Sequence, residues 1–173
     1  MERPVAAQTS GAVDTAWMIR HHAPRSNAND DFADMTIDVQ GNVYVIGRST
    51  NRIYGRSILL VKYDAGGAEL WSAEYTAGEG EESRAVAVAV DAAQNVYVVG
   101  HATGGQTRFD IVTLKFNAAG ERQWLARYNG AANTDDEAAA LAVSATGHVF
   151  VLGESAESDR SCFNPTIPIP SAM

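Results

Sequence analysis

The feature that most constrains this chain is an internal repeat of about 53 residues. Three ten-residue segments share one pattern at that spacing: DVQGNVYVIG from Asp38, DAAQNVYVVG from Asp91 and SATGHVFVLG from Ser144. Rare residues keep the same register, since the three tryptophans stand at 17, 71 and 124 and the only two lysines at 62 and 115. A fixed period of this length is typical of repeat architectures, in which each repeat forms one supersecondary unit.

Each unit divides into four short segments with strand-like patterns. In the best-preserved unit they cover 84–91, 96–101, 110–117 and 122–128. In the first of these, alanine alternates with valine. Because side chains of a strand alternate between its faces, the pattern predicts one valine face and one small face packed against a crowded neighbour.

Turn residues between the segments agree with this division. Asp38 and Gly41 suit a tight hairpin, because the aspartate bonds nearby backbone N–H groups and glycine adopts a positive φ. Gln94 replaces this glycine in the second unit, at a cost on the order of 1 kcal/mol if φ is positive there. The stretch 135–143 has an acidic start and an alanine run that favour a helix, but its register in the repeat predicts a strand.

Four antiparallel strands per unit, with one Trp and one Tyr position each, are typical of a β-propeller blade. We therefore predict an all-β protein of β-propeller type, with four-stranded antiparallel blades and about three blades in all. The predicted parts are a flexible segment 1–15, repeats over 16–155 (16–31 in part, 32–75, 84–128 and 137–153 in part) and an irregular tail 156–173. Because closed propellers usually have at least four blades, we expect a fragment or an oligomer-completed ring, with self-association through exposed blade edges and end faces.

The run D-x-x-G-N-V-Y-V-x-G, followed by V-K-Y-D-x-x-G and W-x-x-x-Y, resembles the bacterial β-propeller repeat family known as SBBP. The first unit carries it at Asp38, Gly41, Asn42, Tyr44, Gly47, Lys62, Tyr63, Asp64, Gly67, Trp71 and Tyr75. The resemblance implies a scaffold without a shared catalytic residue, belonging to a larger exported bacterial protein and placed outside the cell or on its surface. The N-terminal residues do not agree with export, because they lack the apolar run of a secretory signal.

Composition bears on partners. Thirteen Lys and Arg against 21 Asp and Glu give a net charge of −8, which argues against nucleic acid as a partner. No segment approaches the ~18 apolar residues of a membrane span. The single Cys162 forms no internal disulfide and does not indicate a redox compartment.

Acidic residues recur in the loops that enter the first strand of each unit. These candidate metal ligands are Asp30, Asp31, Glu81, Glu82, Asp135 and Asp136. If they ring a channel mouth, they suit a hard cation such as Ca²⁺ or a cationic partner. The alternative is solvated loop charge, because no loop has the spacing of a dedicated calcium loop; no other cofactor is predicted.

The leading functional hypothesis is a non-enzymatic scaffold or interaction module with a protein or glycan partner. A propeller enzyme of lyase or hydrolase type, similar to virginiamycin-lyase or NHL-type propellers, and a Ca²⁺-dependent adhesion module are the alternatives. No catalytic residue is assigned, because His21, His22, His101 and His148 occupy different repeat positions. The recurring Trp and Tyr residues are expected to pack between blades, the alternative being an exposed aromatic surface for glycans or peptides.

Overall fold

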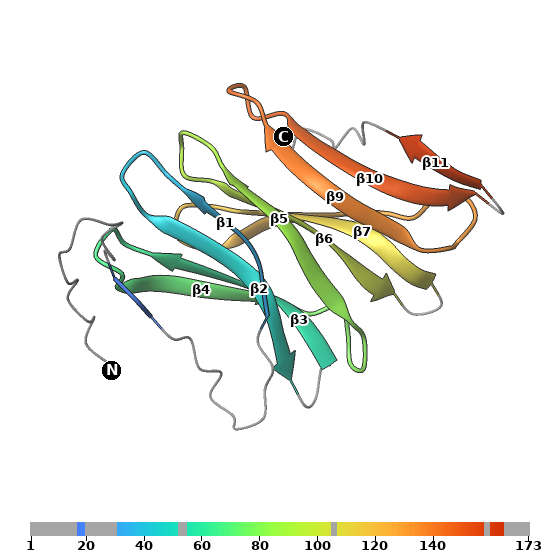
Figure 1. Ribbon diagram of the computed structural model, residues 1–173, viewed down its shortest axis with the longest axis horizontal. Helices are drawn as coiled ribbons and strands as arrows, with labels where there is room; N and C mark the ends of the chain where they lie inside the picture. Colours follow the sequence, from blue (N-terminus) through green and yellow to red (C-terminus); the bar gives the residue numbers. More distant parts are fainter. Residues whose placement is uncertain (1–16, 20–30, 52–54, 105–106, 158–159, 165–173) are drawn as a thin grey trace, which may run out of the picture.

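The computed structural model describes residues 17–19, 31–51, 55–104, 107–157 and 160–164, and all regular structure in these ranges is β-strand (Figure 1). The strands are β1 (Asp31–Ile37), β2 (Val43–Asn51), β3 (Gly55–Tyr63), β4 (Glu69–Tyr75), β5 (Ser83–Val90), β6 (Val96–Gly104), β7 (Thr107–Phe116), β8 (Arg122–Tyr128), β9 (Asp136–Val143), β10 (Val149–Glu157) and β11 (Arg160–Asn164). Three antiparallel sheets result: sheet 1 is β1-β2-β3-β4, sheet 2 is β5-β6-β7-β8, and sheet 3 is β11-β10-β9. The predicted all-β class and the antiparallel four-stranded sheets are confirmed.

The repeat register also decides the two ambiguous segments correctly. The alanine-rich stretch that favours a helix forms β9, whose backbone pairs with β10. Gln94 has a φ of 62°, close to the 82° of Gly41 at the equivalent position, so a non-glycine residue adopts the left-handed conformation there. Tertiary pairing therefore overrides local propensity at both places.

A hydrogen-bonded Asp–Asn–Tyr network explains why the motif keeps the same spacing in successive units. Asp91 accepts the Asn95 backbone N–H at 2.9 Å, the Asn95 side-chain amide at 2.8 Å and the Tyr97 hydroxyl at 3.0 Å. Asp38 makes the same contacts with Asn42 and Tyr44. In both units the aspartate closes the turn and ties it to the buried tyrosine of the next strand.

These networks predict an acid-sensitive component of stability. Burial raises the pKa of Asp91, but hydrogen bonds from Asn95, Tyr97 and Ala93 outweigh it and leave the pKa below 3.8; the pKa of Asp38 is lowered by equivalent contacts. Because the folded pKa lies below the unfolded one, this stabilisation is complete above about pH 5 and is lost as the pH falls through the folded pKa.

We expect urea unfolding, followed by tryptophan fluorescence, to show this loss below about pH 4. A chain carrying Asp38→Asn and Asp91→Asn keeps an oxygen acceptor at each turn but has no carboxylate there. Its unfolding free energy should be lower at pH 7 and decline less between pH 5 and pH 3. Equal slopes for the two proteins would contradict the assignment.

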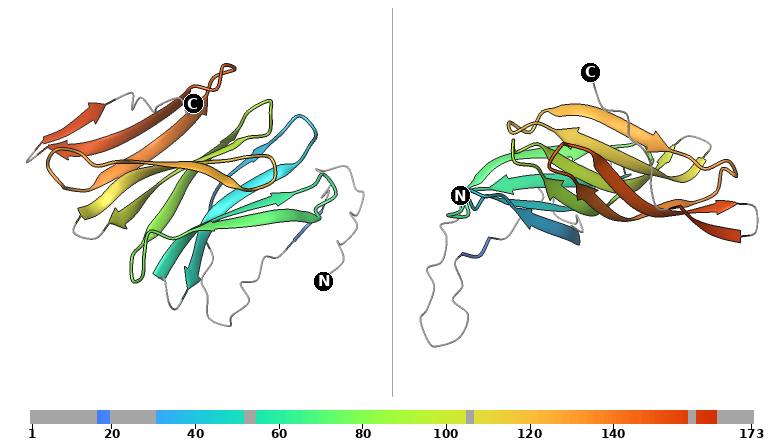
Figure 2. Two further views of the ribbon diagram at one scale, coloured as in Figure 1. Left: turned by 180° about the vertical axis from the view of Figure 1, so that it is seen from behind. Right: turned by 90° about the horizontal axis from the view of Figure 1, so that it is seen from above.

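The sheets lie side by side in chain order, with sheet 2 in the middle (Figures 1 and 2). β5 packs against β1, β2 and β3, and β9 packs in the same way against β5, β6 and β7. Between sheets 1 and 2, Tyr44, Ile46 and Leu60 are buried against Val98 and Leu114. Apolar burial between successive sheets therefore stabilises the stack.

A β-bulge changes the predicted faces of β5. Its register against β6 shifts between Ala85 and Ala87. As a result Ala85 and Val88 pack towards sheet 1, whereas Val86 and Ala87 pack towards sheet 3. Strict alternation of one valine face and one alanine face is thus wrong, because the bulge moves residues before it to the other face.

The structure also differs from the predictions near both ends. Trp17–Ile19, which belong to the partial repeat unit predicted over 16–31, are not in a strand. Residues 1–16 and 20–30 lie outside the described residues. The tail predicted to be irregular continues β10 to Glu157 and adds β11, which pairs with β10. β11 ends at Asn164, before Pro165, so proline does not interrupt its ladder.

Candidate functional site

The described acidic loop residues do not form one cluster. Asp31 pairs with Arg48, Glu82 with Arg56 at 3.0 Å, and Asp135 with Arg108 at 2.9 Å. Glu81 lies in the loop between β4 and β5, where its backbone N–H donates to the Gly78 carbonyl at 3.3 Å, and Asp30 lies outside the described residues. Among the residues that the structure describes, no three His, Cys, Asp or Glu side chains are placed to hold a metal ion.

Asp136 differs from these ion-paired loop residues because it is buried. Its side chain is fully buried, and one carboxylate oxygen accepts the Gly130 N–H at 2.7 Å. The other oxygen has no hydrogen-bond partner among the described residues. Asp136 thus fastens the loop that precedes β9.

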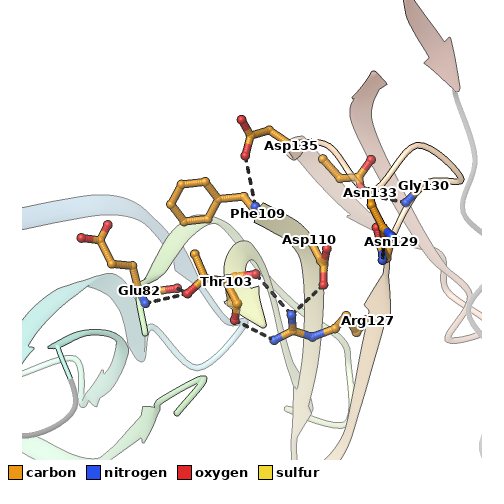
Figure 3. Close-up of polar contacts among 11 residues, drawn as sticks. Glu82, Thr103, Phe109, Asp110, Arg127, Asn129, Gly130, Asn133 and Asp135 are labelled. Atoms are coloured by element: carbon orange, nitrogen blue, oxygen red, sulfur yellow. Dashed lines mark hydrogen bonds and ion pairs between the residues drawn. The ribbon is translucent and has the colours of Figure 1, made fainter. Parts of the chain in front are cut away.

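Further polar contacts link the loops before β5 and β9 to strands β6 and β7 of sheet 2, and join β7 to β8 (Figure 3). The Arg127 guanidinium donates to Asp110 Oδ2 at 2.7 Å and to the backbone oxygens of Ala102 and Thr103 at 3.3 and 3.2 Å. Burial lowers the pKa of Arg127, but the hydrogen bond to the Asp110 carboxylate outweighs it and the pKa is raised. The Arg127–Asp110 pair therefore joins β7, β8 and the end of β6. The sequence did not indicate this pair, because unit 1 has Ser57 and Glu74 at the repeat positions of Asp110 and Arg127.

The two described histidines lie apart in the fold. His101 is on β6, with its ring 5.5 Å from that of Phe109, and desolvation lowers its pKa. His148 lies in the turn between β9 and β10, next to Thr146. His21 and His22 are outside the described residues, so the expected lack of convergence among the four histidines stays a prediction.

Trp71 and Trp17 pack on equivalent turns of sheets 2 and 1. Trp71 on β4 lies over Gly120 of the next sheet, and its Nε1–H donates to the Ala118 carbonyl at 3.0 Å. Trp17 lies in the same way over Gly67, with its ring 5.9 Å from that of Tyr63. These two contacts match the prediction that tryptophan packs between units.

Exposed apolar side chains gather on the outer face of sheet 1, which we call the open face. It borders a hollow of about 630 Å³ lined by Trp17, Ile19, Phe32, Ala33, Asp34, Met35, Val43, Val45 and Tyr63. Phe32 is 75% exposed, and Met35 and Ile37 are each 56% exposed. The sequence predicted an apolar end face. Phe32, Met35 and Ile37 could have been identified as part of it, because they stand at the repeat positions of Ala85, Val88 and Val90 in the second unit.

No protein-family model matches the chain, and no curated protein matches it either. In the ranges that the structure describes, no helix is long and apolar enough to cross a membrane.

Proposed function

We propose that this chain is a non-enzymatic β-propeller-type scaffold that binds another protein through the open face of sheet 1. The chemistry of that face carries the proposal. Phe32, Met35 and Val45 present hydrocarbon, and the carboxylate that shares the hollow, Asp34, accepts the Val88 N–H at 3.0 Å. A surface of this kind suits an apolar protein face better than a glycan, which needs several polar partners.

The scaffold part of the proposal rests on what the recurring residues do. The Asp–Asn–Tyr networks close turns, and Trp71 packs on the next sheet. Lys62 and Lys115 lie over the rings of Tyr44 and Tyr97, at 5.0 and 5.4 Å from the ring centres. The repeated motif is thus used for folding, which fits the SBBP resemblance and its implied place in a larger exported bacterial protein.

The propeller part rests on the way successive sheets meet. The first strand of each following sheet, β5 and then β9, packs across the sheet before it. Propeller blades repeat in this way around an axis, with the first strand of each blade innermost. In this proposal, sheets 1, 2 and 3 are consecutive blades.

A dye that binds apolar surfaces tests the open face. At concentrations where light scattering shows monomers, 1-anilinonaphthalene-8-sulfonate should bind the native protein and brighten, and Met35→Glu should reduce the signal severalfold. The control is Leu125→Glu, because Leu125 is also exposed but lies on β8 of the middle sheet. Equal dye binding by all three folded proteins would remove the open face as the binding surface.

A further inference from the structure

The two junctions inside the chain show one packing rule. Ile58 of sheet 1 points a methyl group at Gly100 of sheet 2, 3.0 Å from where a glycine Cβ would lie. Ile111 of sheet 2 points the same methyl group at Gly153 of sheet 3. Each sheet thus offers an isoleucine side to the glycine side of the sheet that follows it.

The open face is the glycine side of sheet 1. Gly47 stands at the repeat position of Gly100 and Gly153 and lines a smaller hollow with Val45, Leu59, Val61 and Tyr63. The equivalent residues of sheet 2 are Val98, Val112, Leu114 and Phe116, which are buried against sheet 1. The open face therefore repeats, position by position, a surface that is covered elsewhere in the same chain.

The outer side of sheet 3 is the counterpart of this surface. Phe150 and Leu152 stand at the repeat positions of Tyr44 and Ile46, which pack on sheet 2. In the ladder, the backbone of Phe163 pairs with that of Glu154 as Ile58 pairs with Arg48, so the register of the repeat extends into β11. Phe150 is 47% exposed, because no described sheet follows.

Trp17 strengthens the correspondence. Trp71, which belongs to the fourth strand of sheet 1, packs on the Gly120 turn of sheet 2. Trp17 packs on the equivalent Gly67 turn of sheet 1, where the fourth strand of a preceding sheet would lie. Sheet 3 has three strands, with β11 at its edge next to that fourth position.

We propose that the partner of the open face is a second copy of this chain. Sheet 3 of one copy packs on the open face of the other, and Trp17–Ile19 of that other copy lie alongside β11. The proposal rests on the proposed function, because it names the occupant of the same face. The internal junctions provide its geometry, since the new contact continues an interface already present twice in each chain.

The number of copies follows from the geometry of propellers. The contact is head-to-tail, so its copies either close into a ring or extend as a filament. Two copies supply twice the three sheets that the structure describes in each chain, which falls within the usual range of four to eight blades, whereas three copies exceed it. A closed dimer, with two equivalent contacts, is the expected assembly.

Light scattering after size exclusion, on the full chain, tests the contact. The wild-type chain should have twice its mass of 18.4 kDa, and Leu125→Glu should leave that unchanged. Met35→Glu damages only the open face and Leu152→Glu only the outer side of sheet 3, so each protein alone should be monomeric. An equimolar mixture should recover a 1:1 dimer, since one undamaged pair of faces remains.

Other outcomes would overturn the proposal in distinguishable ways. A dimer lost with Met35→Glu but kept with Leu152→Glu would show open face against open face. A wild-type chain that stays monomeric at high concentration while still binding the dye at the open face would exclude the second copy and leave the proposed function standing. A monomer that binds no dye would remove both.

Discussion

Replacing Gly100 by alanine is expected to cost at least about 3 kcal/mol of unfolding free energy, because core overpacking against backbone leaves little room to relax. A Cβ at this position would overlap the backbone oxygen of Arg84 on the adjacent strand and lie 3.0 Å from the Ile58 methyl of sheet 1. Neither neighbour can move away without breaking the bulged pairing of β5 with β6 or the packing between sheets. Urea unfolding monitored by circular dichroism measures the loss.

Gly80→Ala is the matched control for this substitution. Gly80 has a φ of 76°, but no atom lies within 4 Å of the position that a Cβ would take there. Alanine at this residue should cost about 1 kcal/mol from backbone strain alone. If Gly100→Ala cost no more than this control, the close approach of β5 and β6 would be wrong.

Arg127→Met is expected to have the second-largest effect, a loss of about 2–4 kcal/mol. The substitution keeps much of the apolar stem but removes the guanidinium from Asp110, whose side chain is almost fully buried. It also removes the donors to two carbonyl oxygens at the end of β6. Arg122→Met, on the same strand, is the control: the exposed Arg122 guanidinium lies 6.0 Å from the centre of the Tyr75 ring, so its loss should cost less than about 1 kcal/mol.

Unit 1 offers a replacement pair that sharpens this test. Ser57 and Glu74 occupy the positions of Asp110 and Arg127, and their side chains are hydrogen-bonded to each other. The double variant Asp110→Ser with Arg127→Glu should therefore be more stable than Arg127→Met alone. Additive losses in the double variant would contradict a direct coupling between the two side chains.

Much of the fold was predictable because the repeat supplies three parallel readings of one structure. The alanine-rich β9 and the left-handed Gln94 follow from their equivalents in other units, although local propensity disfavours both. The recurring aspartate, asparagine and tyrosine had the spacing of a turn, and the hydrogen bonds explain that spacing. Repetition thus compensated for weak local signals.

The remaining features depend on contacts that the repeat does not encode. The bulge in β5 exchanges faces between Ala85 and Ala87, and alternation cannot show where a ladder slips. Arg56 reaches Glu82 from another sheet, so acidic loops that look like a metal site in the sequence have arginine partners in space. The pairing of β11 with β10 was hidden by the prolines that follow it.

The most direct test of the central claim is a crystal structure of the full chain grown from the assembled form. The proposed function and assembly predict a ring in which β1, β5 and β9 lie nearest a common axis. They also predict that sheet 3 of a second copy covers Phe32, Met35 and Ile37. A structure with β1 at the periphery, or with these three side chains covered by a different surface, would contradict the claim.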